Sequence, residues 1–540
     1  MDNPCCAPSP LPASVNVPRL CVSALSGGGG KTLLSLGLAR ALAGMGVAVK
    51  PFKKGPDYID AAWLSLAAQC PATNLDPYFL PPPRLRALFA HAVSAVAPAR
   101  AARQTGADGA ALPLALVEGN RGLFDGLDAA GSCSTAELAR ILACPILLSL
   151  DCTKMTRTAA ALVQGMLHFE PGLSFCGVVL NQLGSSRHES AVRRALEQYT
   201  DLPVLGAVPR LPENPLPERH MGIACRGETL AEDAGRILDS LADLARAHVD
   251  LAAVLAAARA APPLPVEGPF WPGQEAGAVA SLQVARPHNE SSALTSAAAT
   301  AAQTSRHAVA AATAGPRIGY VRDAALWFYY QENLEALSRA GAELLCLSLL
   351  DHGAPWPELD GLYLGGGFPE DSAPELSRSR HLTALRGLAN AGAPVYAECG
   401  GFMLLAQGIE REGRLWPMSG VFPVTACFCP KPQGLGYVRG RVARENPYFP
   451  QGLEVRGHEF HYSRCHWSGE APLCALDLER GKGMGQMAGR CRDALIHKRV
   501  WAGYTHIFAP ATPCWAHNFV LAARRFREEQ AAARGGSRLE

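Results

Sequence analysis

Short runs of apolar residues alternate with helix-like segments along the first part of the chain. Between residues 18 and 250 these runs lie at 19–25, 46–51, 114–118, 145–151 and 175–181. Each run is followed by a polar or glycine-rich turn. Continuous apolar runs are typical of strands that are buried on both faces. The pattern therefore predicts a parallel sheet that is covered by helices.

The alternation stops between residues 251 and 315. From about residue 262 the sequence is rich in proline and then in alanine, serine and threonine. Such a segment has too few large apolar side chains to offset the entropy lost on ordering. We predict a largely low-complexity linker here, with a docking segment as the alternative. Residues 1–17 are predicted to be a disordered tail, and residues 526–540 a polar tail.

A second series of apolar runs fills residues 316–525. Candidate strands lie at 317–321, 342–347, 361–364 and 394–398, with helix-like segments between them. The fold class that we predict is α/β, with two doubly wound, mostly parallel-sheet domains joined by a flexible linker.

Composition narrows the range of partners and of compartments. Lys and Arg number 50 and Asp and Glu 48, so a net charge of +2 gives no overall field for nucleic acid or acidic membranes. The 17 cysteines are scattered and include no C-x-x-C pair, which favours a reduced, cytoplasmic protein. No signal-peptide pattern and no long apolar run is found. We expect small-molecule partners, and the sequence leaves a homodimer open.

The first apolar run leads into a glycine loop that carries the chemistry of a phosphate site. The segment GGGGKT follows the strand and opens a helix, although Leu25 stands where the strict P-loop pattern has glycine. Glycine N–H groups can wrap a polyphosphate, and the helix N-terminus adds positive charge. The predicted nucleotide-binding residues of the loop are Gly28, Gly29, Gly30, Lys31 and Thr32, and Thr32 is also a predicted Mg²⁺ ligand.

Lysines and acids cluster at the ends of the next two strands. The segment KPFKKGPDYID places Lys53 at a strand end, with Asp57 and Asp60 just beyond it. Glu118 ends the following strand, and Asp125 comes seven residues later. Because the carboxyl ends of parallel strands meet at one sheet edge, phosphate and a metal ion could share a site there. We include Lys53 among the nucleotide-binding residues.

Several motifs taken together resemble one family. GGGGKT, KPFKKGPDYID, NLDPYFL, VEGNRGLFDG, VVLNQLGSSRH and LPERHMGI occur in this order and resemble the cobyrinic acid a,c-diamide synthase family. That family belongs to the dethiobiotin-synthetase-like P-loop group, whose longer phosphate loop accommodates Leu25. The resemblance implies Mg²⁺ binding by Asp57 and Glu118, adenine recognition by Asn181, and tetrapyrrole carboxylate binding by Tyr58, Asp60 and Asp125.

The second domain contains a candidate nucleophile. In PVYAECGGFMLLA a strand is followed by Cys399 and then by a helix, with Ala397 and Gly401 two residues away on either side. Such an elbow exposes a cysteine, and a helix N-terminus favours its thiolate. The glycines of YLGGGFPE, at another strand end, could supply the oxyanion hole for a glutamine side-chain carbonyl.

The catalytic base must be a histidine that is distant in sequence. His458 and His461 lie in RGHEFHYS, and His506 lies in WAGYTHIFA, 107 residues after Cys399. Class I glutamine amidotransferases place their base at about this spacing, so we assign His506 as the base and His461 to the substrate side or the domain interface. The usual acid two positions later is replaced by Phe508. A dyad, or an acid from elsewhere, must then orient the ring.

The two predicted sites together indicate a glutamine-dependent, ATP-dependent ligase. By resemblance its substrates are ATP, L-glutamine and cobyrinic acid, and Mg²⁺ is the cofactor. Hydrogenobyrinic acid and a nickel sirohydrochlorin remain open as acceptors, and cobyric acid synthase is an alternative with the same domains. A P-loop ATPase switch with an inactive amidotransferase domain is the alternative from another class. The intact elbow at Cys399 argues against that switch.

Overall fold

The computed structural model describes the chain in two compact units. Described residues are 14–96, 112–213, 215–216, 227–271, 315–351, 353 and 355–536, without side chains at 227–232, 535 and 536. The first unit ends within the described residues at Trp271, and the second begins at Gly315. Most of the predicted linker therefore lies outside the described residues.

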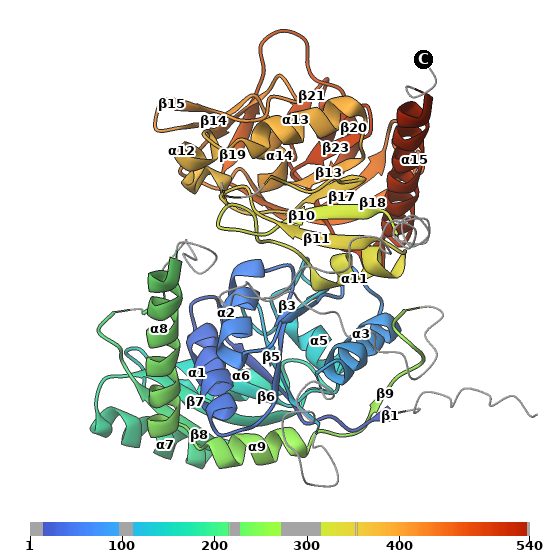
Figure 1. The fold of residues 1–540 in the computed structure, drawn as a ribbon. Helices are drawn as coiled ribbons and strands as arrows, with labels where there is room; N and C mark the ends of the chain where they lie inside the picture. The colour runs from blue at the N-terminus through green and yellow to red at the C-terminus, as the bar shows by residue number, and fades with distance from the viewer. Residues whose placement is uncertain are drawn as a thin grey trace, which may run out of the picture. The chain divides into compact units, whose positions relative to one another are not determined.

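A parallel sheet forms the centre of the first unit (Figure 1). Within the described residues it has seven strands in the order β4-β3-β5-β2-β6-β7-β8, and every pair is parallel. Four central strands are buried almost throughout, as their continuous apolar runs predict. The strands are β2 (Arg19–Ala24), β3 (Val49–Lys54), β4 (Thr73–Leu75), β5 (Leu114–Glu118), β6 (Ile146–Asp151), β7 (Phe175–Leu183) and β8 (Val204–Pro209).

The helices of the first unit form two groups. The chain runs from β2 toward β4 in one direction and from β5 toward β8 in the other, so right-handed crossovers place the connecting helices on opposite faces. Accordingly α1 packs against α2 and α8, and α6 packs against α7. The helices are α1 (Lys31–Gly44), α2 (Tyr58–Ala68), α3 (Pro82–Ser94), α5 (Thr135–Ile141), α6 (Thr158–His168), α7 (Ser186–Tyr199), α8 (Gly227–His248) and α9 (Leu251–Arg259).

The first unit continues beyond residue 250, where the sequence predicts the linker to begin. Helix α9 buries three side chains, Leu251, Val254 and Ala258. After it, β9 (Leu264–Pro265) pairs with β1 (Ser14–Val15), which lies inside the predicted tail of residues 1–17. These elements correct both boundaries. Burial of apolar side chains stabilises α9, and strand pairing stabilises β1 and β9, although the composition of these segments predicts little structure.

The second unit has a mixed sheet whose first half is parallel. Within the described residues the main sheet has eleven strands, ordered β11-β10-β12-β13-β23-β22-β20-β17-β18-β24, with β21 paired to β22. The first five are parallel and the others antiparallel. They are β10 (Arg317–Val321), β11 (Glu343–Leu347), β12 (Gly361–Leu364), β13 (Val395–Glu398), β17 (Gly434–Val442), β18 (Glu454–His461), β20 (Cys474–Arg480), β21 (Gly485–Met487), β22 (Arg490–His497), β23 (Val500–Gly503) and β24 (His506–Ile507).

A smaller sheet and several helices complete the second unit (Figure 1). The order of the smaller sheet is β15-β14-β16-β19. Its strands are β14 (Gly408–Arg411), β15 (Arg414–Pro417), β16 (Thr425–Phe428) and β19 (Ser463–His466), and the helices are α11 (Gln331–Arg339), α12 (Ala373–Leu376), α13 (His381–Ala391), α14 (Gly400–Leu405) and α15 (Cys514–Gly536), with short 3₁₀ turns η2 (Pro369–Asp371) and η3 (Ala509–Ala511).

The C-terminal helix extends well past residue 525, where the sequence predicts a polar tail. Helix α15 runs to Gly536, and Phe526 within it is 5% exposed. Glu529 forms a bidentate pair with Arg499. The buried ring of Phe526 and two ion pairs, Glu529–Arg499 and Arg534–Glu358, therefore dock a segment that is polar overall. Among the described residues, no helix combines the length and the apolarity needed to cross a membrane.

Candidate active sites

The glycine loop after β2 has the conformation that a phosphate site needs. Gly28 and Gly30 have φ values of +75° and +80°, which only glycine adopts without strain. A Cβ added at Gly29 would lie 2.8 Å from the Cβ of Ala24. The loop leads directly into α1, whose first residue is Lys31. The glycine loop and the N-terminus of α1 are thus adjacent, which is the arrangement that binds phosphate in P-loops.

Lys31 and Thr32 lie at the start of α1 and face different partners. The ammonium of Lys31 donates to the carbonyl of Ser26 at 2.9 Å, so this side chain folds back over the loop. Burial, reinforced by nearby Lys53, lowers the pKa of Lys31. The hydroxyl of Thr32 donates to Glu118 at 2.9 Å. Thr32 of the motif therefore contacts the acid at the end of β5.

A buried ion cluster links the ends of β3 and β5. Lys53 and Glu118 are register partners on the two strands, and Lys53 Nζ lies 2.6 Å from Glu118 Oε1. The same ammonium lies 2.6 Å from Asp60 Oδ2 on α2. Burial alone would lower the pKa of Lys53, but the carboxylates outweigh it and raise that pKa. Lys53 thus offsets the charge of acids that are predicted to bind metal and substrate.

The carboxylates of this cluster differ in protonation tendency. Burial raises the pKa of Glu118 to about 7, against the opposing effect of Lys53. Burial, together with the charge of Asp60, raises the pKa of Asp57 to about 6. Asp57 also caps α2 by accepting the N–H of Asp60 at 3.0 Å. Asp60 itself has a lowered pKa, because Lys53 outweighs the effect of burial.

Glu118 retains an open ligand position. Its Oε2 atom is buried and accepts no hydrogen bond within the described residues. No group of three or more Asp, Glu, His or Cys side chains in that part of the chain is arranged to hold a metal ion by itself. Mg²⁺ at nucleotide sites uses one or two carboxylates plus phosphate oxygens and waters. The donor set around Glu118 and Thr32 fits that pattern.

Three other predicted residues are positioned close to the phosphate loop or the ion cluster. A Cβ at Gly30 would overlap the side-chain amide of Asn181, so this residue lies directly against the loop. The carboxylate of Asp125 accepts the N–H of Gly122 at 2.8 Å and acts on the charge of Lys31. Tyr58 is the first residue of α2 and is buried. Residues 217–223 of the LPERHMGI motif lie outside the described residues.

In the second unit, Cys399 lies on a strained turn between β13 and α14. Its φ of 48° and ψ of −104° are unusual for a residue with a side chain. Such strain costs about 1–3 kcal/mol and is common at functional sites. A Cβ at Gly401 would lie 2.6 Å from the Cβ of Leu364, so only a very small residue fits there. This geometry agrees with the predicted nucleophile elbow.

Two glycine segments meet beside the nucleophile. A Cβ added at Gly400 would lie 2.9 Å from the backbone nitrogen of Gly367, and Gly401 N–H donates to the carbonyl of Gly365 at 2.9 Å. The glycine turn after β12 therefore packs on the residue that follows Cys399. The turn after β12 therefore lies beside Gly400, where its N–H groups are candidates for an oxyanion hole.

The thiol of Cys399 is more buried than the sequence suggests. Burial raises its pKa well above the usual value, and the nearby carboxylate of Glu370 raises it further. The N–H of Gly400 lowers it by a smaller amount. The expected thiolate is thus not favoured in the substrate-free protein. Helix α14 has only six residues, so its N-terminus offers little compensation.

The predicted base His506 lies among buried polar groups. Its Nδ1 atom is 3.6 Å from Glu398 Oε2, and both side chains are at most 1% exposed. The ring of His458, its register partner on β18, stacks on it at 4.7 Å. Burial and the neighbouring His506 lower the pKa of His458 far below its usual value. Phe508 is 3% exposed and packs on an aromatic ring instead of supplying an acid.

The segment GHEFHYS lies closer to the nucleophile than predicted. The carbonyl of Phe460 accepts a contact of 3.5 Å from Cys399 Sγ. His461 is 4% exposed, stacks on Tyr504 at 3.7 Å, and has Nδ1 2.8 Å from the carbonyl of Ser463. This side chain is therefore part of the interior of the second unit. The segment borders Cys399, which corrects its predicted placement away from the candidate nucleophile.

Sequence reasoning missed three neighbours of Cys399, namely Glu370, Glu398 and Phe460. Glu398 directly precedes the nucleophile, and Glu370 follows the glycine turn, so both lie inside recognised motifs. Nothing in the spacing indicates that their carboxylates turn toward the centre. Burial raises the pKa of Glu370 to about 7.

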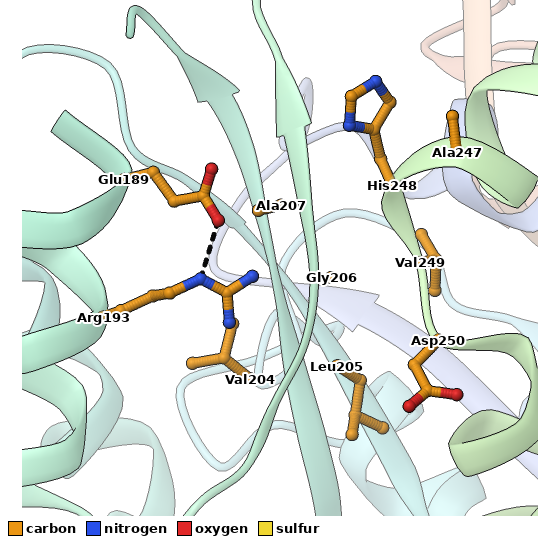
Figure 2. Close-up of a pocket in the computed structure, with 10 residues that line it drawn as sticks. All are labelled: Glu189, Arg193, Val204, Leu205, Gly206, Ala207, Ala247, His248, Val249 and Asp250. Atoms are coloured by element: carbon orange, nitrogen blue, oxygen red, sulfur yellow. Dashed lines mark hydrogen bonds and ion pairs between the residues drawn. The ribbon is translucent and has the colours of Figure 1, made fainter. Parts of the chain in front are cut away.

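A cavity of about 370 Å³ in the first unit lies away from these groups. Figure 2 shows it between α7, β8 and the end of α8, with the ion pair of Glu189 and Arg193 on one side. Strands β6 and β7 separate β8 from β2, which precedes the phosphate loop. The cavity therefore belongs to neither candidate site.

Comparison with known proteins agrees with the two-unit division. Residues 20–223 match the CobQ/CobB/MinD/ParA nucleotide binding domain family, and residues 317–513 match the CobB/CobQ-like glutamine amidotransferase domain family. The cobyrinate a,c-diamide synthase of Magnetococcus marinus is 37% identical, over 93% of this chain and 96% of that protein. That of Dehalococcoides mccartyi is 35% identical, over 95% of this chain and 99% of that protein.

Proposed function

The chain belongs to the cobyrinate a,c-diamide synthase family, and from this premise we propose that it amidates the a and c side-chain carboxylates of cobyrinic acid in cobalamin biosynthesis. The reaction uses ATP and L-glutamine, which makes the protein a glutamine-hydrolysing carbon–nitrogen ligase. The observation that carries the proposal is the presence of two sites in one chain. One is a phosphate loop with Lys31, and the other is a cysteine elbow at Cys399.

The second unit supplies ammonia from glutamine. Cys399 Sγ attacks the side-chain amide carbon, His506 takes the thiol proton and passes it to the departing nitrogen, and the N–H groups near Gly367 and Gly400 stabilise the oxyanion. Water then cleaves the thioester to release glutamate. Because burial keeps the free thiol protonated, transfer of its proton to His506 must accompany the attack.

The first unit activates the acceptor. A carboxylate is a poor electrophile, so it takes the γ-phosphoryl group of ATP to form an acyl phosphate, and ammonia then displaces phosphate to give the amide. Lys31 and the loop N–H groups offset the charge that develops on the transferring phosphoryl group. Lys53 must leave part of its present ion cluster to reach phosphate oxygens. Asn181, which lies against the loop, is proposed to recognise adenine.

Mg²⁺ is proposed as the cofactor of the first unit. Thr32, Asp57 and Glu118 would hold it, since the free Oε2 atom of Glu118 and the adjacent hydroxyl of Thr32 suit a hard cation. When bound, the ion would neutralise phosphate charge during transfer. Lys53 supplies positive charge to the same acids while no nucleotide is bound.

The acceptor site is proposed to use Tyr58, Asp60 and Asp125. Asp60 belongs to the ion cluster, Tyr58 begins the same helix, and Asp125 acts on the charge of Lys31 in the phosphate loop. A carboxylate must lie near these groups to receive a phosphoryl group. His461 remains a proposed substrate residue with less support, because it is buried inside the second unit. Cytoplasmic location, a homodimer, and the absence of membrane and nucleic-acid partners also remain predictions.

Isotope transfer tests the proposed linkage of the two reactions. Glutamine with heavy nitrogen in its side-chain amide should give corrinoid amides that carry this label when ATP and cobyrinic acid are present. If glutamine were hydrolysed but none of the macrocycles named above gave a labelled product, the ligase function would be refuted. Label in a hydrogenobyrinic acid or nickel sirohydrochlorin product alone would redirect the acceptor assignment.

A further inference from the structure

The base of the second unit lacks an acid at the position where related glutaminases carry one. Phe508, two residues after His506, is buried against the ring of Tyr330 at 4.9 Å. A catalytic histidine needs a partner that fixes its ring and stabilises the imidazolium formed during reaction. Another side chain of the second unit must therefore orient the ring of His506.

Glu398 has the position and the charge for that task. Its Oε2 atom lies 3.6 Å from His506 Nδ1, slightly longer than a hydrogen bond. Contacts of this kind often shorten when substrate binds. The pair has side-chain exposures of 0% and 1%, so little solvent screens the charge. An acid opposite Nδ1 leaves Nε2 as the ring nitrogen for proton transfer.

The carboxylate of Glu398 is itself held firmly. Its Oε1 atom accepts the N–H of Ile507 at 3.0 Å, and its Oε2 atom accepts the hydroxyl of Tyr363 at 3.0 Å. Asn333 in turn donates to the oxygen of Tyr363 and to the carbonyl of Ile507. One carboxylate thus joins the strand end before the nucleophile to the segment that carries the base.

We propose that Glu398 is the positioning residue that orients His506 and stabilises its protonated form during glutamine hydrolysis. The acid of the usual triad is then supplied by the residue directly before the nucleophile instead of by the residue two positions after the base. Because Glu398 ends β13 and Cys399 follows it, one strand end sets both the nucleophile and the base. This inference rests on the proposed glutaminase function of the second unit.

A double-mutant cycle tests the proposal. Glu398→Gln keeps the shape and the acceptor for Ile507 N–H but removes the charge, so kcat for glutamine hydrolysis should fall on the order of 10²–10⁴-fold with little change in KM. In a His506→Ala background the same substitution should cost nothing further, because its effect acts through the ring. Glu412→Gln, an exposed change in the same unit, is the matched control.

The outcomes separate this inference from the proposed function. Near-wild-type hydrolysis by Glu398→Gln would overturn the proposal. An equal loss of kcat from Glu398→Gln in the wild-type and His506→Ala backgrounds would also overturn it, because it would indicate a purely structural role. Ammonia-driven amidation should be unaffected in every variant, and thermal unfolding should show that the second unit remains folded. Retained hydrolysis in Cys399→Ala would instead refute the glutaminase itself, whatever Glu398 does.

Discussion

The hydroxyl of Thr32 donates a 2.9 Å hydrogen bond to Glu118, which connects the first turn of α1 to the end of β5. The two residues are 86 positions apart, and adjacent parallel strands bring them together. The order in which the chain adds strands reverses at this place, since β2 leads toward one edge of the sheet and β5 toward the other. Ligands of parallel sheets bind at the point where the strand order reverses. The hydrogen bond therefore lies at the proposed nucleotide site.

Loss of Lys31 should stop amidation whichever nitrogen source is offered. Lys31→Ala removes the cation that follows the transferring phosphoryl group, and we expect ATP-dependent amidation to fall by about two orders of magnitude or more. Product formation would be measured with glutamine and, separately, with a high concentration of ammonium. Lys431→Ala, at an exposed position in the second unit, is the control. Normal ammonium-driven turnover in folded Lys31→Ala would refute the phosphate-site assignment.

Loss of Cys399 should separate the two reactions. Cys399→Ala should abolish glutamine hydrolysis and glutamine-dependent amidation, because only the ammonia source is lost. Amidation with high ammonium should continue near the wild-type rate. Cys346→Ala, at an exposed cysteine of the same unit, should change neither reaction. Glutamine-dependent amidation by Cys399→Ala would show that another group is the nucleophile.

Glu370 should make the stability of the second unit depend on pH. Burial raises its pKa from 4.5 to about 7, so between these values the folded state binds more protons than the unfolded state. The contribution of Glu370 to the free energy of unfolding therefore falls as pH rises through this window, by on the order of 3 kcal/mol in total.

Glu370→Gln removes that titration. The melting temperature of the variant relative to wild type should increase from about pH 5 to pH 8, as measured by calorimetry on the transition of the second unit. Glu412→Gln, exposed to solvent, should show no such trend. A constant difference across the range would mean that Glu370 titrates normally in the folded protein.

The linker should be dispensable for chemistry. Residues 276–312 have an alanine-, serine- and threonine-rich composition that cannot build a core, and changing loop length costs only about 0.6 kcal/mol per doubling. Deleting them should leave both activities intact. Limited proteolysis of the whole protein should cut first in this stretch and give two folded fragments. A first cut elsewhere, or an unfolded fragment, would contradict the predicted boundary.

The sequence predicts features whose chemistry is local. The phosphate loop and the elbow at Cys399 are visible because glycine spacing, a preceding strand and a following helix are adjacent in sequence. The roles of two acids are not visible in this way, since Glu370 approaches Cys399, and Glu398 approaches His506, only through packing of separate elements. The strand register explains the pair of Lys53 and Glu118, but no sequence spacing encodes it.

The predicted boundaries at residues 250 and 525 are wrong for a related reason. Helix α9 is composed mainly of alanine and leucine, which resembles low complexity, yet Leu251 and Val254 are buried. The last part of helix α15 is polar, yet the buried ring of Phe526 and the Glu529–Arg499 and Arg534–Glu358 ion pairs dock it past the predicted end. The antiparallel half of the second sheet was likewise absent from the prediction, because its strands carry mixed polar patterns. The average composition of a segment therefore does not show the few contacts that decide where a helix or a domain ends.

The most direct test of the proposed function is a steady-state reaction with glutamine, ATP and each candidate macrocycle, read by product mass. We predict that cobyrinic acid yields first a monoamide and then the a,c-diamide, with one ATP and one glutamine consumed for each amide. Hydrogenobyrinic acid and a nickel sirohydrochlorin should react poorly. Absence of any amide from cobyrinic acid, or amidation at side chains other than a and c, would contradict the proposed function.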